Sequence, residues 1–354
     1  YSSAASDVYK RQGHNVEVAS IAYFDFDGMV DVRVISNKER VNSVRVRPLS
    51  YKITPDCVGD TVTFSLSRPR NLSVEVNGDI FHNLHLFANP IDKFRPSDKE
   101  IQRALKKKKG SNLIYFGPGV HNLPNDTLFV PSGTTVYIDG GARVYGNIFT
   151  EGAHDVNIFG RGEVHPDGRG AGVWVRRSKN VRIDGIVVSQ LPIGQCDSVE
   201  LTNVKSISYY GWGDGMDVFS SSNVILDGVF CRNSDDCAAV YASTQGFKGG
   251  SNNVLVKNAT LWADVAHPIN IGGHGDPNGM DTVQNVTFRN IDILDQAEKQ
   301  IDYQGCLAIN PGDNTLVRNI TFENIRIEDF RNGQLVNFRI SFNPKYCVST
   351  GRGI

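Results

Sequence analysis

The stretch KNVRIDG at residues 179–185 and the stretch SNVILDG at residues 222–228 share one pattern. A turn residue precedes Val, and apolar and polar positions then alternate. The pattern recurs from about residue 111 onward, with first aliphatic positions 18 to 34 residues apart. The shorter intervals predict single coils of a right-handed parallel β-helix, and the longer ones indicate loops that lengthen on one side. These aliphatic positions are Val136, Val156, Val181, Val199, Val224, Val254, Val286 and Ile320.

Stacking explains why such a repeat would fold. One coil cannot bury its inward aliphatic side chains alone, but stacked coils share one apolar core. An asparagine often precedes the strand, and Asn tolerates a left-handed turn while stacked amides can hydrogen-bond along the coil axis. The main rival fold, a leucine-rich-repeat horseshoe, lacks the regular Leu spacing and the helical runs that it needs. The recurring amides are Asn180, Asn223, Asn253, Asn285 and Asn319.

The chain before residue 111 has a different pattern. Residues 13–92 contain short alternating runs separated by turn residues at 8–12-residue intervals, which predicts a β-sandwich domain. Residues 93–110 predict a helical linker, with Ser97 as N-cap, Glu100 at the third helical position and Gly110 at the end. The Lys106–Lys109 run suits a solvated helix C-terminus better than a nucleic-acid patch, because no aromatic residues interleave with it. Residues 111–354 predict the β-helix.

The two ends of the sequence need separate treatment. Residues 1–12 have no apolar core typical of a signal peptide, and we interpret them as a non-native leader outside the fold. The last residues, VSTGRGI (348–354), contain no closing element, so we expect a truncated C-terminus. A secreted or periplasmic location is expected, although no secretion signal is present in this stretch.

Composition excludes several classes of protein. Charged residues make up 21% and the formal net charge is -1, so no overall field favours nucleic acid or a membrane surface. No apolar run reaches the length of a transmembrane helix. The six cysteines form no CxxC pair, and buried free thiols are expected rather than a zinc site. A disulfide between Cys231 and Cys237 is the alternative.

Three acids recur at the coil interval. Asp214 lies 21 and 22 residues before Asp235 and Asp236, so stacked coils should bring the three together. Crowded carboxylates repel one another, which favours function over stability, and a shared site pushes their pKa values apart. Glycoside hydrolysis needs such a pair of acid and base. A calcium site is the other functional interpretation, whereas Asp217 and Asp227 are interpreted as turn aspartates.

The segment GDGMDVFSSSNVILDGVFCRNSDDCAAVYA (213–242) resembles the core of glycoside hydrolase family 28, the polygalacturonases. The resemblance covers residues 111–340 and implies inverting hydrolysis without a cofactor or metal. Asp235 matches the general acid, while Asp214 and Asp236 match the carboxylates that hold the water. Because adjacent residues of a regular strand face opposite ways, Asp235 and Asp236 need a turn or bulge to share one site. Residues 71–90 resemble instead the amino-terminal domain of the related family 49 dextranases.

The histidine of the family has two candidates here. The letters GGHG at 272–275 match its Gly-His-Gly motif, but AHPINIGG at 266–273 fits the following residues better. We therefore predict His267 as the catalytic-site residue and His274 as a substrate-binding residue. The alternative for either histidine is a structural role as a hydrogen-bonded loop residue.

Substrate groups are predicted by the same resemblance. The family's Arg-Ile-Lys motif corresponds to YQGCLAINPGD at 303–313, which has no basic residue, although Arg339 could compensate from a later coil. A neutral glycan is therefore expected. Five aromatic residues could stack on sugars, and we assign this role to Trp212 and Tyr303, with Gln304 beside them. The other three are Trp174, Trp262 and Tyr241.

The combined prediction is an inverting glycoside hydrolase that acts on a polysaccharide or oligosaccharide, with no nucleic-acid partner and no membrane insertion. Two rivals stay open: a calcium-dependent polysaccharide lyase, and a non-catalytic glycan-binding β-helix. The sequence does not determine the sugar, the linkage, endo or exo action, or the oligomeric state.

Overall fold

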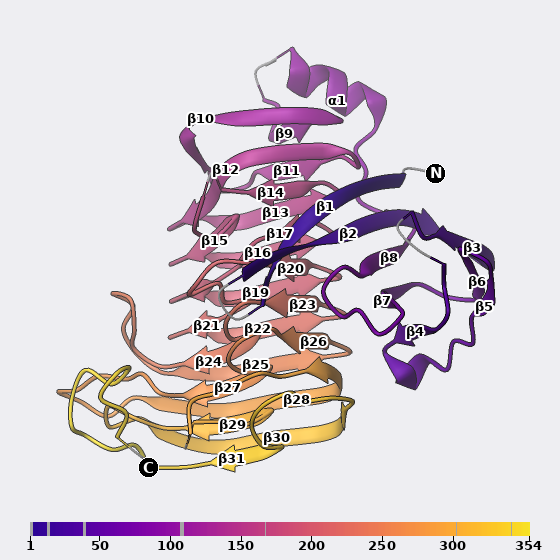
Figure 1. The fold of residues 1–354 in the computed structure, drawn as a ribbon. Coiled ribbons are helices and arrows are strands. Elements are labelled where there is room, and N and C mark those ends of the chain that lie inside the picture. The colour runs from indigo at the N-terminus through magenta and orange to yellow at the C-terminus, as the bar shows by residue number, and fades with distance from the viewer. Residues whose placement is uncertain are drawn as a thin grey trace. The chain divides into compact units, whose positions relative to one another are not determined.

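A computed structural model describes residues 3–12, 15–37, 40–106, 110–166, 168–301, 303–340 and 342–354. The chain divides into two compact units, Tyr1–Phe94 and Arg95–Ile354 (Figure 1). No helix in the described part of the chain is both long and apolar enough to cross a membrane.

The first unit consists of two antiparallel-rich sheets around one core, as the alternating pattern predicts. The apolar side chains between them come from both sheets and include Phe26, Val46, Phe64, Leu72 and Leu86. The β-sandwich is therefore confirmed. The larger sheet has the order β1-β2-β8-β7-β4 and the smaller one the order β3-β6-β5. The elements are β1 (Ser3–Gln12), β2 (Asn15–Phe26), β3 (Val30–Ile35), β4 (Val44–Arg47), the 3₁₀-helix Leu49–Tyr51, β5 (Asp56–Val58), β6 (Thr61–Leu66), β7 (Arg70–Val76) and β8 (Leu84–Pro90).

Strand β1 belongs to the stretch that the sequence analysis leaves out of the fold. Its backbone pairs antiparallel with β2 over its whole length, from Ser3 opposite Phe24 to Gln12 opposite Asn15. The stretch is thus an edge strand of the larger sheet, and its exclusion from the fold is wrong. Its non-native origin stays a prediction.

A short helix opens the second unit. Helix α1 (Asp98–Leu105) begins with the predicted capping box, in which Ser97 and Glu100 each bond the other's backbone N–H. The helix ends at Leu105 rather than at Gly110. Residues 107–109 of the basic run lie outside the described residues.

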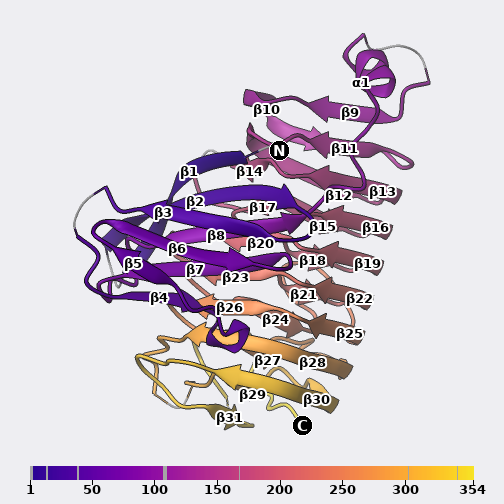
Figure 2. The same cartoon turned by 90° about the vertical axis from the view of Figure 1, so that its right-hand side faces the viewer.

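The rest of the second unit is a right-handed parallel β-helix. All its strands belong to one 23-stranded sheet that coils through three columns. The first column contains β9 (Leu113–Phe116), β11 (Thr135–Ile138), β13 (His154–Gly160), β16 (Lys179–Asp184), β19 (Asp197–Thr202), β22 (Ser222–Asp227), β25 (Ser251–Lys257) and the first parts of β28 (Thr282–Asp295) and β30 (Leu316–Ile327). In Figure 2 the strands from β13 to β30 of this column lie one below another.

The other two columns complete each coil. The second column contains the first parts of β10 (Gly119–Phe129) and β12 (Ala142–Glu151), then β14 (Glu163–His165), β17 (Val187–Val188), β20 (Lys205–Ile207), β23 (Phe230–Asn233), β26 (Thr260–Ala263) and the last parts of β28 and β30. The third column contains the last parts of β10 and β12, then β15 (Val173–Arg176), β18 (Ile193–Gly194), β21 (Val218–Phe219), β24 (Ala238–Tyr241), β27 (Ile269–Gly272), β29 (Leu307–Asn310) and β31 (Val336–Phe338).

The register of the first column follows the predicted repeat. Each repeat position from Val156 to Ile320 lies directly opposite the next one along the axis, and most are fully buried. The first position differs, because Val136 pairs with Ile158 rather than Val156. A shift of two residues keeps the same face inward, so alternation alone does not distinguish the two registers.

The predicted asparagine ladder also forms. All five asparagines have positive φ, and Asn253 donates to Asn223 Oδ1 at 2.7 Å while Asn319 donates to Asn285 Oδ1 at 3.1 Å. The first two members bond aspartates of the preceding coil instead, since Asn223 bonds Asp197 and Asn180 bonds Asp155. Asn285 bonds Asn252 rather than Asn253. A second ladder at the other end of the same strands, through Asn258, Asn290 and Asn324, was not predicted.

The cysteines are free thiols, and most of them pack in the core. All six are free, so the Cys231–Cys237 disulfide is not formed. Four of them are buried, as expected for small apolar side chains: Cys196, Cys231, Cys237 and Cys306.

Candidate active site

A pocket of about 220 Å³ lies where four aspartates meet on neighbouring coils. Three of them, Asp214, Asp235 and Asp236, are the predicted acids, and the fourth is Asp217. The remaining lining residues are Trp212, Phe219, Tyr241, Thr244, Gln245, Ala266, His274, Glu298, Tyr303 and Tyr346.

Backbone hydrogen bonds bring the loop of Asp214 against the next coil. Gly215 N donates to Asp236 O at 2.7 Å, and Met216 N donates to Cys237 O at 2.9 Å. A Cβ at Gly215 would lie 2.2 Å from Cys237 O, so the close approach requires glycine at this position. The loop then enters β21 directly after Asp217.

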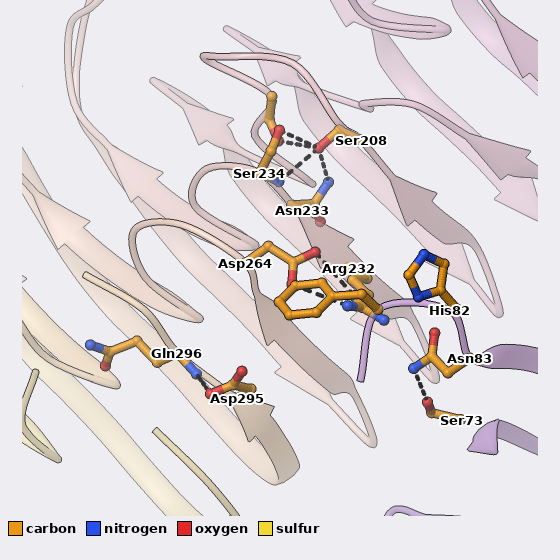
Figure 3. Close-up of polar contacts among 12 residues, drawn as sticks. Ser73, His82, Asn83, Ser208, Arg232, Asn233, Ser234, Asp264, Asp295 and Gln296 are labelled. Atoms are coloured by element: carbon orange, nitrogen blue, oxygen red, sulfur yellow. Dashed lines mark hydrogen bonds and ion pairs between the residues drawn. The ribbon is translucent and has the colours of Figure 1, made fainter. Parts of the chain in front are cut away.

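Asp235 and Asp236 lie in the turn between β23 and β24. A buried network anchors this turn to the preceding coil: Ser208 Oγ accepts from Ser234 N at 3.0 Å and from Asn233 Nδ2 at 3.1 Å (Figure 3). Asn233 Nδ2 also donates to Asp214 O at 3.2 Å. The break in the strand lets both aspartates line the pocket, so the predicted turn is confirmed.

Asp236 is the most fully hydrogen-bonded of the four. Its Oδ1 accepts from His267 N at 2.9 Å and bonds His267 Nδ1 at 2.7 Å, while Oδ2 accepts from Tyr241 OH at 2.6 Å and from Asn270 Nδ2 at 2.8 Å. Burial alone would raise its pKa, but the charge of His267 and these hydrogen bonds lower the pKa to about 2. Asp236 is therefore ionised across the physiological pH range.

His267 lies behind Asp236 and is completely buried. Its second ring nitrogen, Nε2, bonds Tyr303 O at 2.5 Å, so both nitrogens face acceptors and both carry a hydrogen. Burial would lower its pKa, yet the charge of Asp236 and the hydrogen bonds to Asp236 and Tyr303 raise the pKa to about 9. His267 is thus a cation that holds Asp236 and does not itself line the pocket.

The pKa values of the other three aspartates are raised, opposite to the pKa of Asp236. Burial and the charges of Asp214 and Asp236 raise the pKa of Asp235 well above its usual value. Burial and neighbouring aspartates do the same to the pKa values of Asp214 and Asp217, and these two carboxyl groups share a hydrogen bond. Such a bond requires a proton between them. The pocket therefore combines one ionised carboxylate with carboxyl groups that retain protons.

Aromatic side chains form the rim of the pocket. Trp212 is 63% exposed and meets Tyr346 edge-on, with ring centroids 6.2 Å apart. Tyr346 stacks on Tyr303 at 5.3 Å. Lys345 Nζ lies 4.8 Å from the Tyr346 ring and 6.0 Å from the Trp212 ring. The rim can stack on a sugar ring.

Three of the four predicted substrate-binding residues line the pocket. Trp212, Tyr303 and His274 line the pocket, and His274 meets Tyr241 edge-on at 4.9 Å. Gln304 is not among the described lining residues, and its backbone O accepts from Gln334 Nε2 at 3.2 Å. Trp262 is fully buried under Arg232, whose guanidinium lies 3.8 Å from its ring centre.

The sequence analysis missed several pocket residues. Asp217 is 2% exposed and lines the pocket, so its interpretation as a turn aspartate is wrong. Its spacing of three residues from Asp214, inside the quoted motif, was the available signal. Tyr241, named only as a possible sugar-stacking residue, follows Asp236 on β24, and Asn270 on β27 donates to Asp236 without lining the pocket, whereas Glu298 had no signal. Asp227 is structural, accepting from Asn258 in the second ladder.

No cluster of three or more His, Cys, Asp or Glu side chains suited to a metal occurs among the described residues.

Comparison with known proteins identifies the family. The sequence profile described as Glycosyl hydrolases family 28 matches residues 167–348, just over half of the chain. The chain belongs to this family. A polygalacturonase from Juniperus ashei is 28% identical over 280 residues, which are 70% of this chain and 50% of that protein. An exopolygalacturonase from Cochliobolus carbonum is 24% identical over 246 residues, 60% of this chain and 52% of that protein. The family 28 chain spans about half the length of these curated relatives.

A solved structure extends the likeness in fold. Dex49A from Penicillium minioluteum superposes with a TM-score of 0.58 at 15% identity, covering 96% of this family 28 chain and 75% of that one. At this identity the likeness shows the fold alone.

This family 28 member departs from the family motif at its basic pair. Strand β29 pairs with β27 and therefore lies one coil beyond His267, where the motif places Arg-Ile-Lys. Register puts Ala308 opposite Asn270 and Asn310 opposite Gly272, so neither position carries a cation. Arg339 follows β31 one coil further on, and it is absent from the described pocket lining.

Proposed function

We propose that the chain is an inverting glycoside hydrolase that cleaves O-glycosidic bonds of a neutral polysaccharide or oligosaccharide. The observation that carries this proposal is that Asp235 and Asp236 line one pocket, where His267, Tyr241 and Asn270 donate to Asp236 alone. These donors lower the pKa of Asp236, whereas burial raises the pKa of Asp235. Hydrolysis of a glycoside needs one carboxylic acid that keeps its proton and one carboxylate that has lost it. Membership of family 28 supports the same reaction.

Each acid has a role in this proposal. Asp235 donates its proton to the leaving-group oxygen, since its raised pKa keeps that proton available. Asp236 and Asp214 hold the attacking water, and the water loses one proton to Asp236, the ionised carboxylate, as it adds to the sugar. His267 is a positioning residue that keeps Asp236 ionised and oriented.

The neutral substrate follows from the pocket lining. No Lys or Arg is present among its described lining residues, and five of those residues are carboxylic acids. A uronate carboxylate there would lose its hydration without gaining a cationic partner, which costs several kcal/mol. A neutral sugar would not carry this cost. The relatives named polygalacturonases make polygalacturonate the necessary comparison.

Release of reducing ends from a panel of neutral glycans and polygalacturonate tests the proposal. We expect a neutral glycan to be cleaved fastest, with the first product of opposite anomeric configuration to the bond cleaved. The same activity should survive chelation. A calcium requirement, or products with an unsaturated sugar, would favour the lyase. Preference for polygalacturonate, together with its loss in Arg339→Ala, would overturn the substrate assignment while leaving the acids in place.

A further inference from the structure

Glu298 is a pocket carboxyl group that the catalytic proposal does not use. It lies beyond β28, lines the pocket with the four aspartates, and is 8% exposed. Its position in the chain lies outside the acid motif. Its role must therefore be read from its contacts.

Only one oxygen of this carboxyl group accepts a hydrogen bond from the described residues. Oε1 accepts from Gln300 N at 2.6 Å. Oε2 accepts no hydrogen bond from the described residues. Because Glu298 lines the pocket, Oε2 is the oxygen of this carboxyl group available to a ligand there.

Structural carboxylates in this chain have a different contact pattern. Asp313 accepts from Val348 N at 3.1 Å through one oxygen and from Ser349 N at 2.8 Å through the other. Asp264 bonds the guanidinium of Arg232 through both of its oxygens. A buried carboxylate that serves the fold is satisfied at both ends, because an unpaired buried charge is costly. Glu298 leaves one end for a ligand.

The surroundings of Glu298 are unfavourable to anions. Burial raises the pKa of Glu298 and the charge of Asp236 adds to this effect, while the hydrogen bond from Gln300 N and the charges of His267 and Lys345 act to lower it. His267 is buried behind Asp236, and Lys345 is an exposed rim residue. An acidic ligand group inside the pocket would lie among five carboxylic acids, with no Lys or Arg among the described lining residues.

We propose that Glu298 determines the substrate class of this pocket. Its Oε2 bonds a hydroxyl group of a neutral sugar, and its negative charge excludes a uronate carboxylate from the same place. The proposal rests on the proposed function in taking the ligand to be a sugar. Glu298 takes no part in proton transfer to the scissile bond.

Binding of trigalacturonate and of a neutral trisaccharide, measured by calorimetry at neutral pH, tests this without requiring turnover. The variants are Glu298→Gln, which removes the charge but keeps an acceptor, and Glu298→Lys, which reverses the charge. We expect Glu298→Lys to tighten trigalacturonate binding by about tenfold or more, the scale of a reversed charge at short range in a shielded pocket. Glu298→Gln should tighten it less. The neutral sugar should bind more weakly to the Lys variant.

The matched control is Glu200→Lys, the same charge change on the exposed face of β19. It should leave the ratio of the two affinities unchanged. A merely structural role for Glu298 would lower the melting temperature and weaken both ligands alike, and an unchanged ratio in Glu298→Lys would overturn the proposal. If the ratio shifts but no glycan is hydrolysed, the hydrolase proposal fails while Glu298 keeps its assignment.

Discussion

Asp235 and Asp236 are adjacent in sequence and line one pocket, yet their pKa values move in opposite directions. The difference lies in their donors. Asp236 receives hydrogen bonds from His267, Tyr241 and Asn270, whereas Asp235 receives one from the backbone N–H of Asp236 at 3.1 Å. A carboxylate that several donors stabilise stays ionised, and a buried one without them keeps its proton.

Replacement of Asp235 by Asn should reduce turnover by about 10²–10⁴-fold, because general acid catalysis contributes on that order. The free energy of unfolding should stay equal or rise, since the Asn Oδ1 can still accept from Asp236 N and the amide, like the protonated acid, carries no charge. Initial rates and denaturant unfolding measure the two effects. Asp197→Asn on the exposed first column is the control for turnover. Near-wild-type turnover in Asp235→Asn would refute the mechanism.

The buried ion pair of His267 and Asp236 predicts a pH dependence of stability. The pKa of His267 rises from 6.5 to about 9 on folding, so its contribution is complete below pH 6.5 and is lost as pH rises towards 9. A shift of that size corresponds to about 3 kcal/mol. Between these two pH values the wild type should lose about that much more stability than His267→Gln. Groups distant from this ion pair titrate alike in both proteins and cancel in the difference. Parallel stability curves would contradict the ion pair.

Sequence reasoning brought Asp214, Asp235 and Asp236 together because their interval equals a coil, and coils stack in register. It selected His267 by the residues that follow it. It missed Glu298 and Asn270, and it named Tyr241 only as a possible sugar-stacking residue, because their contacts depend on how side chains of neighbouring coils meet, and loop lengths set that. Tyr303 lines the pocket and Gln304 is not among the described lining residues, a difference that the loop after β28 sets.

At the scale of the element, the first column was predictable almost position by position. Inward aliphatic residues recur at each coil, and a residue that slipped by one place would turn its whole strand outward. A slip by two places has no such penalty, which is why Val136 was matched to Val156 instead of Ile158. The short strands of the third column, such as β18 and β21, carry too few residues for their pattern to be read.

The asparagine ladder allows its two contributions to be separated at Asn253. This residue has φ of 56° and donates to Asn223 at 2.7 Å. Asn253→Gly should cost about 0.5–1.5 kcal/mol for the lost hydrogen bond. Asn253→Ala should cost about 1–2 kcal/mol more, because Ala is strained in the left-handed region. Denaturant unfolding of both variants measures the difference. Equal destabilisation would show that the turn conformation contributes nothing.

At the scale of the whole molecule, two separate cores were predicted from the change of pattern near residue 111, and the units divide at Phe94 and Arg95. The sandwich core and the β-helix core are distinct sets of side chains. The sequence assigned residues 93–110 to a linker, whereas Arg95 begins the second unit and pairs with Asp139 at 2.8 Å, a contact between residues far apart in the chain.

The charge of the molecule makes a prediction about its response to salt. The formal net charge is -1, so no strong field attracts or repels a neutral glycan. Hydrolysis of the preferred glycan should therefore change little as salt rises through the range where the Debye length falls from about 30 Å to about 8 Å. Initial rates at several ionic strengths measure this. A steep fall in kcat/KM would indicate an ionic anchor for the substrate and contradict the neutral assignment.

The constant register of the first column also limits which changes of chain length the protein can absorb. The repeat interval grows from 18 to 34 residues along the chain, yet Val181, Val254 and Ile320 still occupy equivalent places in the stack. Insertions between strands are therefore tolerated as bulges of the surface. An extra coil inserted between β21 and β24 would instead separate Asp214 from Asp235 by one more coil along the axis. Homologous proteins can therefore differ in the loops that surround the pocket while keeping the same acidic residues. Sequence differences that change the preferred substrate should be concentrated in those loops.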